Sequence, residues 1–328
     1  MGISANAAPS DSSYRELLNS RDWATLEKVT RERSQIFNLD LALIIQRATA
    51  LVHLGRRAEA LALLNDLEKN VNQQIGLEVR SKRDNLASVF LKESALQLYQ
   101  EGLEYLYEKK YTKAATRFQE SLSEDPDQYL SLIRLAQTLF YQKNFDESIR
   151  TFNRAGVFKP ENENIKKWIA RATFEKGELK EALRAFSKIY QEKKIKSQSL
   201  VIWYSDALSK TGLRAHAISL LKKEVDENPY YVEGILKLAK FELDSSAGNS
   251  AKSVMSIKKN LQVALSRIDY VLKNKIINES DQTDAFLYDL PSIKVQVEKL
   301  IEVMDLKLSN LSRKRALEPT GEREESGI

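Results

Sequence analysis

The sequence of 328 residues contains no cysteine and only two histidines, His53 and His216. Without thiols the chain can form no disulfide, no thiolate zinc site and no cysteine nucleophile. It also has no glycine-rich phosphate loop, no G-x-S-x-G turn around a serine nucleophile and no H-E-x-x-H zinc motif. The sequence therefore predicts no catalytic residue, no metal site and no cofactor. An enzyme would depend on carboxylates alone, and nothing distinguishes such a pair from helix-surface charges among 46 acidic residues.

Proline and glycine are sparse, with 6 and 11 copies, while long segments alternate polar and apolar residues at helical spacing. This combination favours an all-helical fold over one that contains a sheet. Hydrophobic residues make up 42% of the chain, enough to bury a continuous core. No run of 18 apolar residues occurs, so the sequence predicts no membrane-spanning helix.

The formal net charge is +5. Residues 161–280 contain 22 Lys and Arg against 15 Asp and Glu, a balance of +7, so the remainder of the chain carries −2. Such an excess is small for a nucleic-acid-binding protein, and a solvated helical surface explains it as well. A basic surface over residues 161–280 that binds nucleic acid is kept as the alternative function.

One pattern of residues is written twice between Ala95 and Pro160, with a period of 34. The first copy has Gly102, Tyr105, Tyr111, Ala114, Phe118 and Pro126, and the second has Ala136, Leu139, Phe145, Ser148, Phe152 and Pro160. This period, with a small residue, an aromatic residue, Ala-x3-Phe and Pro in that order, is the tetratricopeptide signature. The stretch resembles the tetratricopeptide repeat (TPR) family.

Further copies start at positions 7, 41, 163, 198 and 232, so the two clear copies at 95 and 129 lie inside an array. Glycines at the turn between the two helices of a copy support this register at Gly55, Gly177 and Gly212. The resemblance implies an all-α, right-handed alpha-alpha superhelix, a TPR-like solenoid of about seven helix pairs with a C-terminal capping helix.

The predicted organisation has six parts. These are a disordered tail over 1–13, N-terminal TPR-like pairs over 14–74, a linking helix or insertion over 75–94, the main array over 95–275, a capping helix over 284–315 and a second disordered tail over 316–328. For 75–94, one long helix leading into the next copy and one additional helix fit equally well. The apolar stripe that begins at Ile293 suits a cap over the last repeat, with a dimerisation helix as the alternative.

The N-terminal residues leave the location of the protein open. Ala5-Asn6-Ala7 has the A-x-A form of a secretory cleavage site, but no basic and apolar leader precedes it. We expect an exported, bacterial periplasmic protein by a slight margin, which the lack of cysteine supports, and a cytoplasmic one as the alternative.

The resemblance also implies where a partner would bind. In this family the first helix of each pair lines a concave groove, and the groove positions map onto four copies. They are Tyr99, Leu103, Tyr107, Ile133, Gln137, Tyr141, Lys167, Arg171, Phe174, Ile202, Asp206 and Lys210. Such a groove is aromatic at one end and cationic further on, which suits a peptide or an extended protein segment. The alternative for each residue is helix packing or plain surface.

The leading hypothesis is a non-enzymatic TPR scaffold or adaptor that binds a protein segment in its groove, in the assembly of an envelope or secretion complex. The sequence does not identify the partner or the oligomeric state.

Overall fold

The computed structural model describes residues 11–34, 40–160, 162–192, 197–228, 231–244, 250–274 and 290–317. These ranges contain sixteen α-helices. In order, they are α1 (Asp11–Ser20), α2 (Trp23–Ser34), α3 (Leu41–His53), α4 (Arg57–Lys69), α5 (Gln73–Ser88), α6 (Glu93–Tyr107), α7 (Tyr111–Glu124), α8 (Tyr129–Tyr141), α9 (Phe145–Phe158), α10 (Glu163–Glu175), α11 (Leu179–Glu192), α12 (Gln198–Lys210), α13 (Arg214–Glu227), α14 (Val232–Leu243), α15 (Ala251–Asn274) and α16 (Leu290–Leu317). The predicted tails, 1–13 and 316–328, lie almost entirely outside the described residues.

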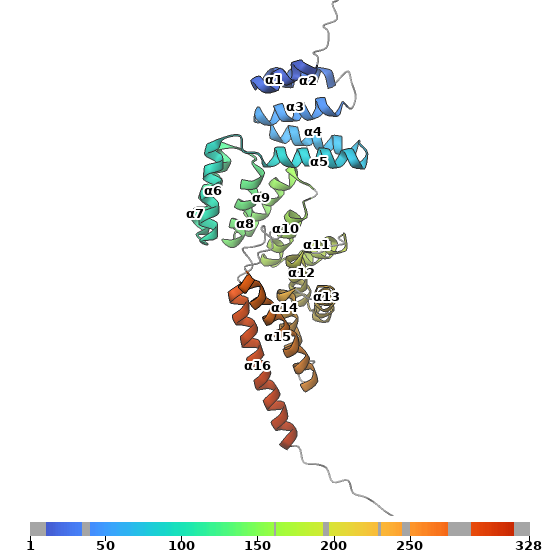
Figure 1. Cartoon of the computed structure of the whole chain (residues 1–328), viewed down its shortest axis with the longest axis vertical. Coiled ribbons are helices and arrows are strands. Elements are labelled where there is room, and N and C mark those ends of the chain that lie inside the picture. Colours follow the sequence, from blue (N-terminus) through green and yellow to red (C-terminus); the bar gives the residue numbers. More distant parts are fainter. Residues whose placement is uncertain are drawn as a thin grey trace, which may run out of the picture. The chain divides into compact units, whose positions relative to one another are not determined.

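Within each part of the chain the helices pack in sequential antiparallel pairs, as in a TPR solenoid (Figure 1). The predicted all-α fold class is therefore confirmed. The chain divides into two compact units, Met1–Lys176 and Gly177–Ile328, referred to as unit 1 and unit 2. The sequence placed no boundary at this point, which falls inside the predicted array. No helix in the described ranges is long and apolar enough to cross a bilayer.

The predicted register coincides with the helix starts in five of the seven copies. Helix α6 begins at Glu93, two residues before the predicted start at 95, and the predicted start at position 7 lies outside the described residues. First helices begin at Leu41, Tyr129, Glu163, Gln198 and Val232, the positions that the repeat predicts. Side-chain caps fix several of these starts, because an oxygen just before the helix accepts a bond from an unpaired backbone N–H. Asp40 Oδ1 accepts from the N–H groups of Ala42 and Leu43 at 3.0 and 3.2 Å.

The second helix of each copy places one large side chain in the core. Leu64, Phe118, Phe152, Phe186 and Leu221 are fully buried at this position. The first helix has a small residue opposite that side chain because a larger one would clash with it. A Cβ added at Gly102 would lie 2.6 Å from the Phe118 ring. Small and large residues therefore alternate because the two helices approach closely.

The turn between the helices of a copy uses one left-handed residue. Gly55, Gly177 and Gly212 have φ values of +77°, +96° and +85° at this position. Lysine occupies the same position in the copies at 95 and 129, where Lys109 and Lys143 have φ values of +59° and +63°. A side chain in this region is strained, whereas glycine is not.

At this turn, introducing glycine should stabilise the protein, whereas replacing glycine should destabilise it. We expect Lys143→Gly to raise the free energy of unfolding by about 1 kcal/mol, and Gly55→Ala to lower it by about the same amount. A Cβ at Gly55 would have no neighbour within 4 Å, so its effect reports the backbone alone. Urea unfolding followed by circular dichroism measures both variants, and a stabilised Gly55→Ala variant would contradict the assignment.

The predicted insertion contains one additional helix, α5, which ends at Ser88 before α6 begins at Glu93. Helix α5 packs on α4. The chain then turns, and in Figure 1 the axes of α6 and α7 run across those of α3, α4 and α5. Of the two alternatives for residues 75–94, the structure has the separate helix.

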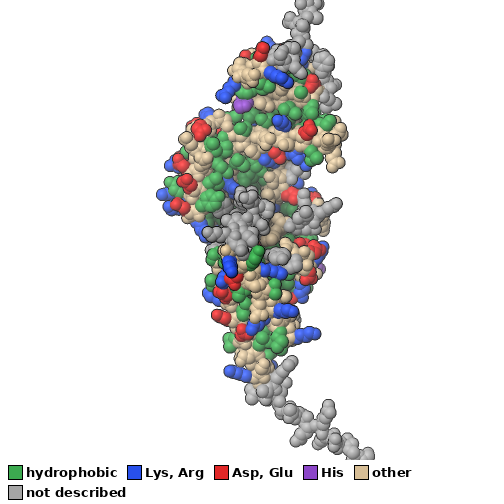
Figure 2. All heavy atoms as spheres, in the orientation of Figure 1, with side chains coloured by type: hydrophobic (Ala, Val, Ile, Leu, Met, Phe, Trp, Pro, Cys, Tyr) green, Lys and Arg blue, Asp and Glu red, His purple; other side chains and the backbone are tan. Residues whose placement is uncertain are grey.

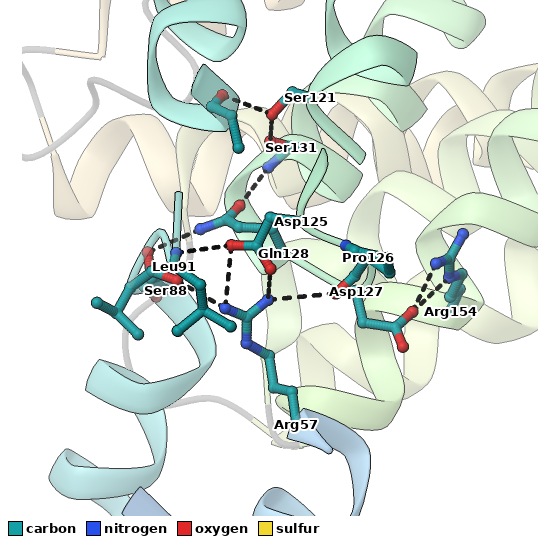
Figure 3. A network of polar contacts seen from close by, with 12 residues as sticks. Arg57, Ser88, Leu91, Ser121, Asp125, Pro126, Asp127, Gln128, Ser131 and Arg154 are labelled. Carbon is teal, nitrogen blue, oxygen red and sulfur yellow. Dashed lines mark hydrogen bonds and ion pairs between the residues drawn. The ribbon is translucent and has the colours of Figure 1, made fainter. Parts of the chain in front are cut away.

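A buried ion pair joins this N-terminal group of helices to the next copies (Figure 3). Arg57 and Asp125 are each 2% exposed, and Arg57 Nη1 lies 3.0 Å from Asp125 Oδ1. Asp125 also accepts from the backbone N–H of Leu91 at 2.9 Å, and Arg57 donates to the carbonyl of Val89 at 2.8 Å. Residues from α4, from the α5–α6 connection and from the α7–α8 turn thus meet at one carboxylate.

Gln128 extends the same network into α8 (Figure 3). Its Nε2 donates to the carbonyl of Ser88 at 2.7 Å, while its Oε1 caps α8 by accepting from the N–H of Ser131 at 2.8 Å. Both ends of the amide are therefore bonded, as a buried amide requires.

Helix α16 covers the last repeat. Its residues Ile293, Val297 and Met304 are buried in one core cluster with Val254, Ile257, Leu261 and Ile268 of α15 and with Leu236 and Ala239 of α14. The apolar stripe predicted for this helix is thus packed within the same chain, as expected of a cap.

His53, at the end of α3, stacks on Trp23 of α2 with ring centroids 4.0 Å apart. Burial lowers its pKa, and Arg21 and Arg57 lower it further by repelling the charged imidazolium. The unfolded chain therefore binds this proton at a higher pH than the folded chain does, since an unperturbed histidine has a pKa of about 6.5.

Stability should consequently fall as the pH decreases below about 6.5, and the loss should end below the lowered pKa of the folded state. His53→Phe keeps a ring against Trp23 and removes this contribution, so its unfolding free energy should depend less on pH over that window. Urea unfolding between pH 5 and 8 measures the difference. An unchanged pH dependence in the His53→Phe variant would contradict this assignment.

Candidate protein-binding surface

The predicted groove residues fall into three groups by exposure. Tyr99, Gln137 and Lys167 are buried, Tyr107 and Lys210 are exposed, and Leu103, Ile133, Tyr141, Arg171, Phe174, Ile202 and Asp206 lie between. Nine of these positions lie in unit 1, three each on α6, α8 and α10. The other three, Ile202, Asp206 and Lys210, belong to α12 in unit 2. The two sets are therefore described separately.

Tyr99 shows why a stripe of aromatic residues is not by itself a surface. Its ring centroid lies 5.2 Å from that of Phe90 and 5.8 Å from that of Phe118. It is only 9% exposed, so most of the side chain packs the core of its copy. Gln137 and Lys167 are still less exposed, at 3% and 2%.

In unit 1 the accessible aromatic surface lies around the α6–α7 turn and the end of α8. Tyr107 is 64% exposed. Tyr141, at the end of α8, stacks on Tyr111, at the start of α7, with centroids 5.2 Å apart and an interplanar angle of 18°. Tyr107, Tyr111 and Tyr141 are called the tyrosine patch below. Figure 2 shows hydrophobic side chains gathered between α6 and α8, with charged ones along the α6–α7 edge.

The tyrosine patch is supported from below by a buried indole. Trp168 of α10 meets the Tyr141 ring edge-on at 6.2 Å and the Phe140 ring at 5.3 Å, and it stacks on Phe152 at 6.0 Å. Aromatic pairs in these geometries stabilise each other beyond their buried area. The orientation of Tyr141 is therefore fixed by the packing of α8 on α9 and α10.

Exposed cations border the tyrosine patch. A shallow hollow beside it is lined by Lys109, Lys110, Tyr111, Thr112, Lys113 and Gln142. Lys110 pairs with Glu108 at 2.7 Å, which raises the pKa of Lys110. Lys113 Nζ lies 5.5 Å from the centroid of the Tyr105 ring. The sequence analysis did not predict these lysines because they follow the first helix, outside the groove positions. Lys109 occupies the turn position that is glycine in the copies at 41, 163 and 198.

The cations predicted further along the groove are differently placed. Arg171 forms an ion pair with Glu175, one turn on in α10, at 2.5 Å, and its guanidinium lies over the ring of Phe174. Lys167 is buried, so its charge is not accessible to a partner at this surface. The exposed positive charge of unit 1 is thus richer beside the tyrosine patch than on α10.

Unit 2 has a hollow of about 220 Å³ between the first helices of its last two copies and the capping helix. It is lined by Ile202, Glu233, Leu236, Lys237, Lys240, Ile293 and Gln296, from α12, α14 and α16. Lys237 pairs with Asp206, and Lys240 Nζ donates to Gln296 Oε1 at 2.9 Å. Burial and the charge of Lys237 lower the pKa of Lys240, so a carboxylate brought by a ligand would be favoured here.

These positions combine three apolar side chains with two cations and one acid, which suits a short protein segment with an apolar side chain next to an acidic one. Of them, only Ile202 was predicted from the sequence. The described residues contain no group of three or more histidine and carboxylate side chains placed to hold a metal ion.

Residues 105–172, from the end of α6 to α10, match the family model described as a tetratricopeptide repeat. This segment of the chain therefore consists of tetratricopeptide repeats. TPR domains typically mediate protein–protein interactions. No curated protein matches the sequence.

Several solved structures are similar to this chain. Yeast Tom70 is 16% identical, with 90% of this chain and 62% of that one covered and a TM-score of 0.48. A tetratricopeptide repeat protein from Parabacteroides merdae is 13% identical, with 89% and 96% covered and a TM-score of 0.46. PilW, a type IV pilus biogenesis factor, is 16% identical, with 70% and 96% covered and a TM-score of 0.45.

Proposed function

We propose that this protein is a non-catalytic scaffold that binds an extended segment of another protein across the tyrosine patch of unit 1. The observation that carries the proposal is Tyr107, a large aromatic side chain left 64% exposed four residues before the Tyr111–Tyr141 stack. Tyrosine offers broad contact area with a polar end and loses little conformational entropy on binding, which is why it is enriched at interfaces.

The surrounding charge indicates the chemistry of the segment. Lys109 and Lys113 are exposed beside the tyrosine patch, so acidic residues next to an apolar or aromatic side chain would complement it. The hollow of unit 2, with Lys237 and Lys240 around an apolar floor, fits the same kind of segment. A role in assembling an envelope or secretion complex stays a prediction from the sequence.

Nucleic acid is less well supported over residues 161–280. Many cations of this region pair with carboxylates, as Arg171 does with Glu175 and Lys222 with Glu242 at 2.8 Å. Cations held in this way contribute little to phosphate binding, which requires exposed positive charge along a track.

Photo-crosslinking tests the proposed site directly. We expect a photoreactive phenylalanine analogue at position 107, in the native host, to crosslink a discrete partner. The same analogue at Val157 should not, although Val157 is 63% exposed on the second helix α9. The double variant Tyr107→Ala/Tyr141→Ala should retain the partner at least about tenfold less well, since aromatic anchors dominate such interfaces. Equal retention by the double variant and the wild type would refute the site.

A further inference from the structure

Helix α15 has an exposed outer face, opposite the residues that it contributes to the core cluster of unit 2. At 24 residues it is much longer than the second helix of the preceding copy, α13, which has 14. At 1.5 Å per residue it extends about 36 Å. One side is buried against α14 and α16 through Val254, Ile257, Leu261 and Ile268.

Three apolar side chains stand on the opposite side. Met255, Val263 and Tyr270 are 60%, 38% and 62% exposed. They are eight and seven residues apart, about two helical turns each, so they form one stripe along the helix. Single exposed apolar residues are ordinary, but an aligned series on one helix marks an interaction surface.

Cations alternate with this stripe. Lys252, Lys259 and Lys273 are exposed and share its side of the helix by their spacing of three or four residues from the apolar side chains. Together with Met255, Val263 and Tyr270 they are called the α15 outer face.

Carboxylates are missing from the α15 outer face. The helix has five cations and a single acid, Asp269, whose Oδ1 lies 2.7 Å from Lys294 Nζ of α16. The remaining lysine, Lys258, pairs with Asp305 of α16. Asp269 and Asp305 thus pair across the contact between α15 and α16, and the outer face keeps a net positive charge.

We propose that the α15 outer face docks an acidic amphipathic helix of a partner protein. A stripe of apolar residues alternating with charges is the pattern by which two helices pack side by side, with the apolar residues in contact and opposite charges across the seam. Glutamate or aspartate flanking the apolar residues of the incoming helix would complement the three lysines. This surface lies on a second helix and shares no residue with the tyrosine patch or the unit 2 hollow, so the inference goes beyond the proposed function.

Charge and geometry favour this occupant over three others. Two copies of the face would oppose lysine with lysine. Nucleic acid is bound through its phosphates, so the apolar side chains of Met255 and Val263 between the cations would contribute little to binding it. A bilayer takes up a broad apolar face, whereas the broad apolar face of α15 is already buried within the protein.

The test uses the full chain and a labelled synthetic helix of about 20 residues with leucine at heptad positions and glutamate beside them. Fluorescence anisotropy should show binding that weakens as salt is added. The triple variant Lys252→Glu/Lys259→Glu/Lys273→Glu should bind at least about tenfold more weakly, and it should bind the matching peptide that carries lysine in place of glutamate.

Two controls separate this surface from the others. Leu77→Asp introduces a charge at a residue that is 57% exposed on α5 in unit 1, and it should leave peptide binding unchanged. Tyr107→Ala/Tyr141→Ala should also leave it unchanged, so failure here is distinguishable from failure of the proposed function.

Several outcomes would overturn the proposal. These are unchanged peptide binding by the triple variant, equal binding of the lysine peptide by the wild type, and tighter binding of polyuridine or of phosphatidylserine vesicles than of the acidic peptide. Self-association that disappears in the triple variant, without peptide binding by the wild type, would show that a second copy occupies the face.

Discussion

Asp125→Ala should lower the free energy of unfolding of unit 1 by about 3–5 kcal/mol, because it leaves a buried guanidinium without its counter-charge. Arg57 is 2% exposed, so water cannot replace the lost carboxylate. The backbone N–H of Leu91 would lose its acceptor as well. The loss should therefore exceed that of an ordinary surface substitution several-fold.

Hydrogen exchange followed by mass spectrometry is the measurement, since it assigns the loss of stability to particular helices. Peptides from α4, α5 and the start of α6 should lose protection in the Asp125→Ala variant, because their backbone and side chains converge on this carboxylate. Peptides from unit 2 should keep their protection.

The neighbouring carboxylate provides a matched control. Asp127 pairs with Arg154 at 2.6 Å, but the two side chains are 34% and 50% exposed. Exposed pairs contribute between about 0 and 1 kcal/mol, and Asp127 has a left-handed backbone with φ +65°, which alanine tolerates less well than aspartate. Asp127→Ala should therefore cost no more than about 1–2 kcal/mol, clearly less than Asp125→Ala. The double variant Arg57→Leu/Asp125→Leu should be less destabilised than the sum of its single changes, because no charge is left buried. Equal effects of Asp125→Ala and Asp127→Ala would show that the buried pair has no special role.

Trp168→Ala should cost a similar amount, about 3–5 kcal/mol, through a cavity in the core between α8, α9 and α10. The indole is 2% exposed and contacts the rings of Phe140, Tyr141 and Phe152. Those rings are themselves packed, so they can fill only part of the space. Urea unfolding followed by circular dichroism measures the cost.

Trp168→Ala should also weaken partner binding, because Tyr141 loses the ring that orients it. Trp168→Phe keeps an aromatic edge and should cost less in both measurements. Tyr107→Ala removes an exposed side chain and should change stability by no more than about 0.5 kcal/mol, while it reduces binding. A Trp168→Ala variant with wild-type stability would contradict the packing described for the three helices.

The features that recur in every copy, such as the helix starts and the small, large and turn positions, could be predicted from the sequence alone. The 34-residue period placed the helix starts at Leu41, Tyr129, Glu163, Gln198 and Val232, because small, large and turn residues each answer a local requirement of a helix pair. Exposure within the groove was not accessible in this way. Tyr99 and Tyr107 are both tyrosines on one helix, eight residues apart, yet the first is 9% and the second 64% exposed.

Features that occur once in the chain, such as long-range ion pairs and the exposure of particular cations, were decided only by the tertiary structure. Arg57 and Asp125 are 68 residues apart in the chain, and nothing in their local sequence distinguishes them from surface charges. They meet because α5 breaks the register and redirects the chain, which brings the start of α4 to the α7–α8 turn. In the same way, α15 shows five cations in sequence, but the packing of α16 decides which remain exposed. A period records the contacts between neighbouring helices, whereas long-range contacts and surface exposure depend on how the chain as a whole is packed.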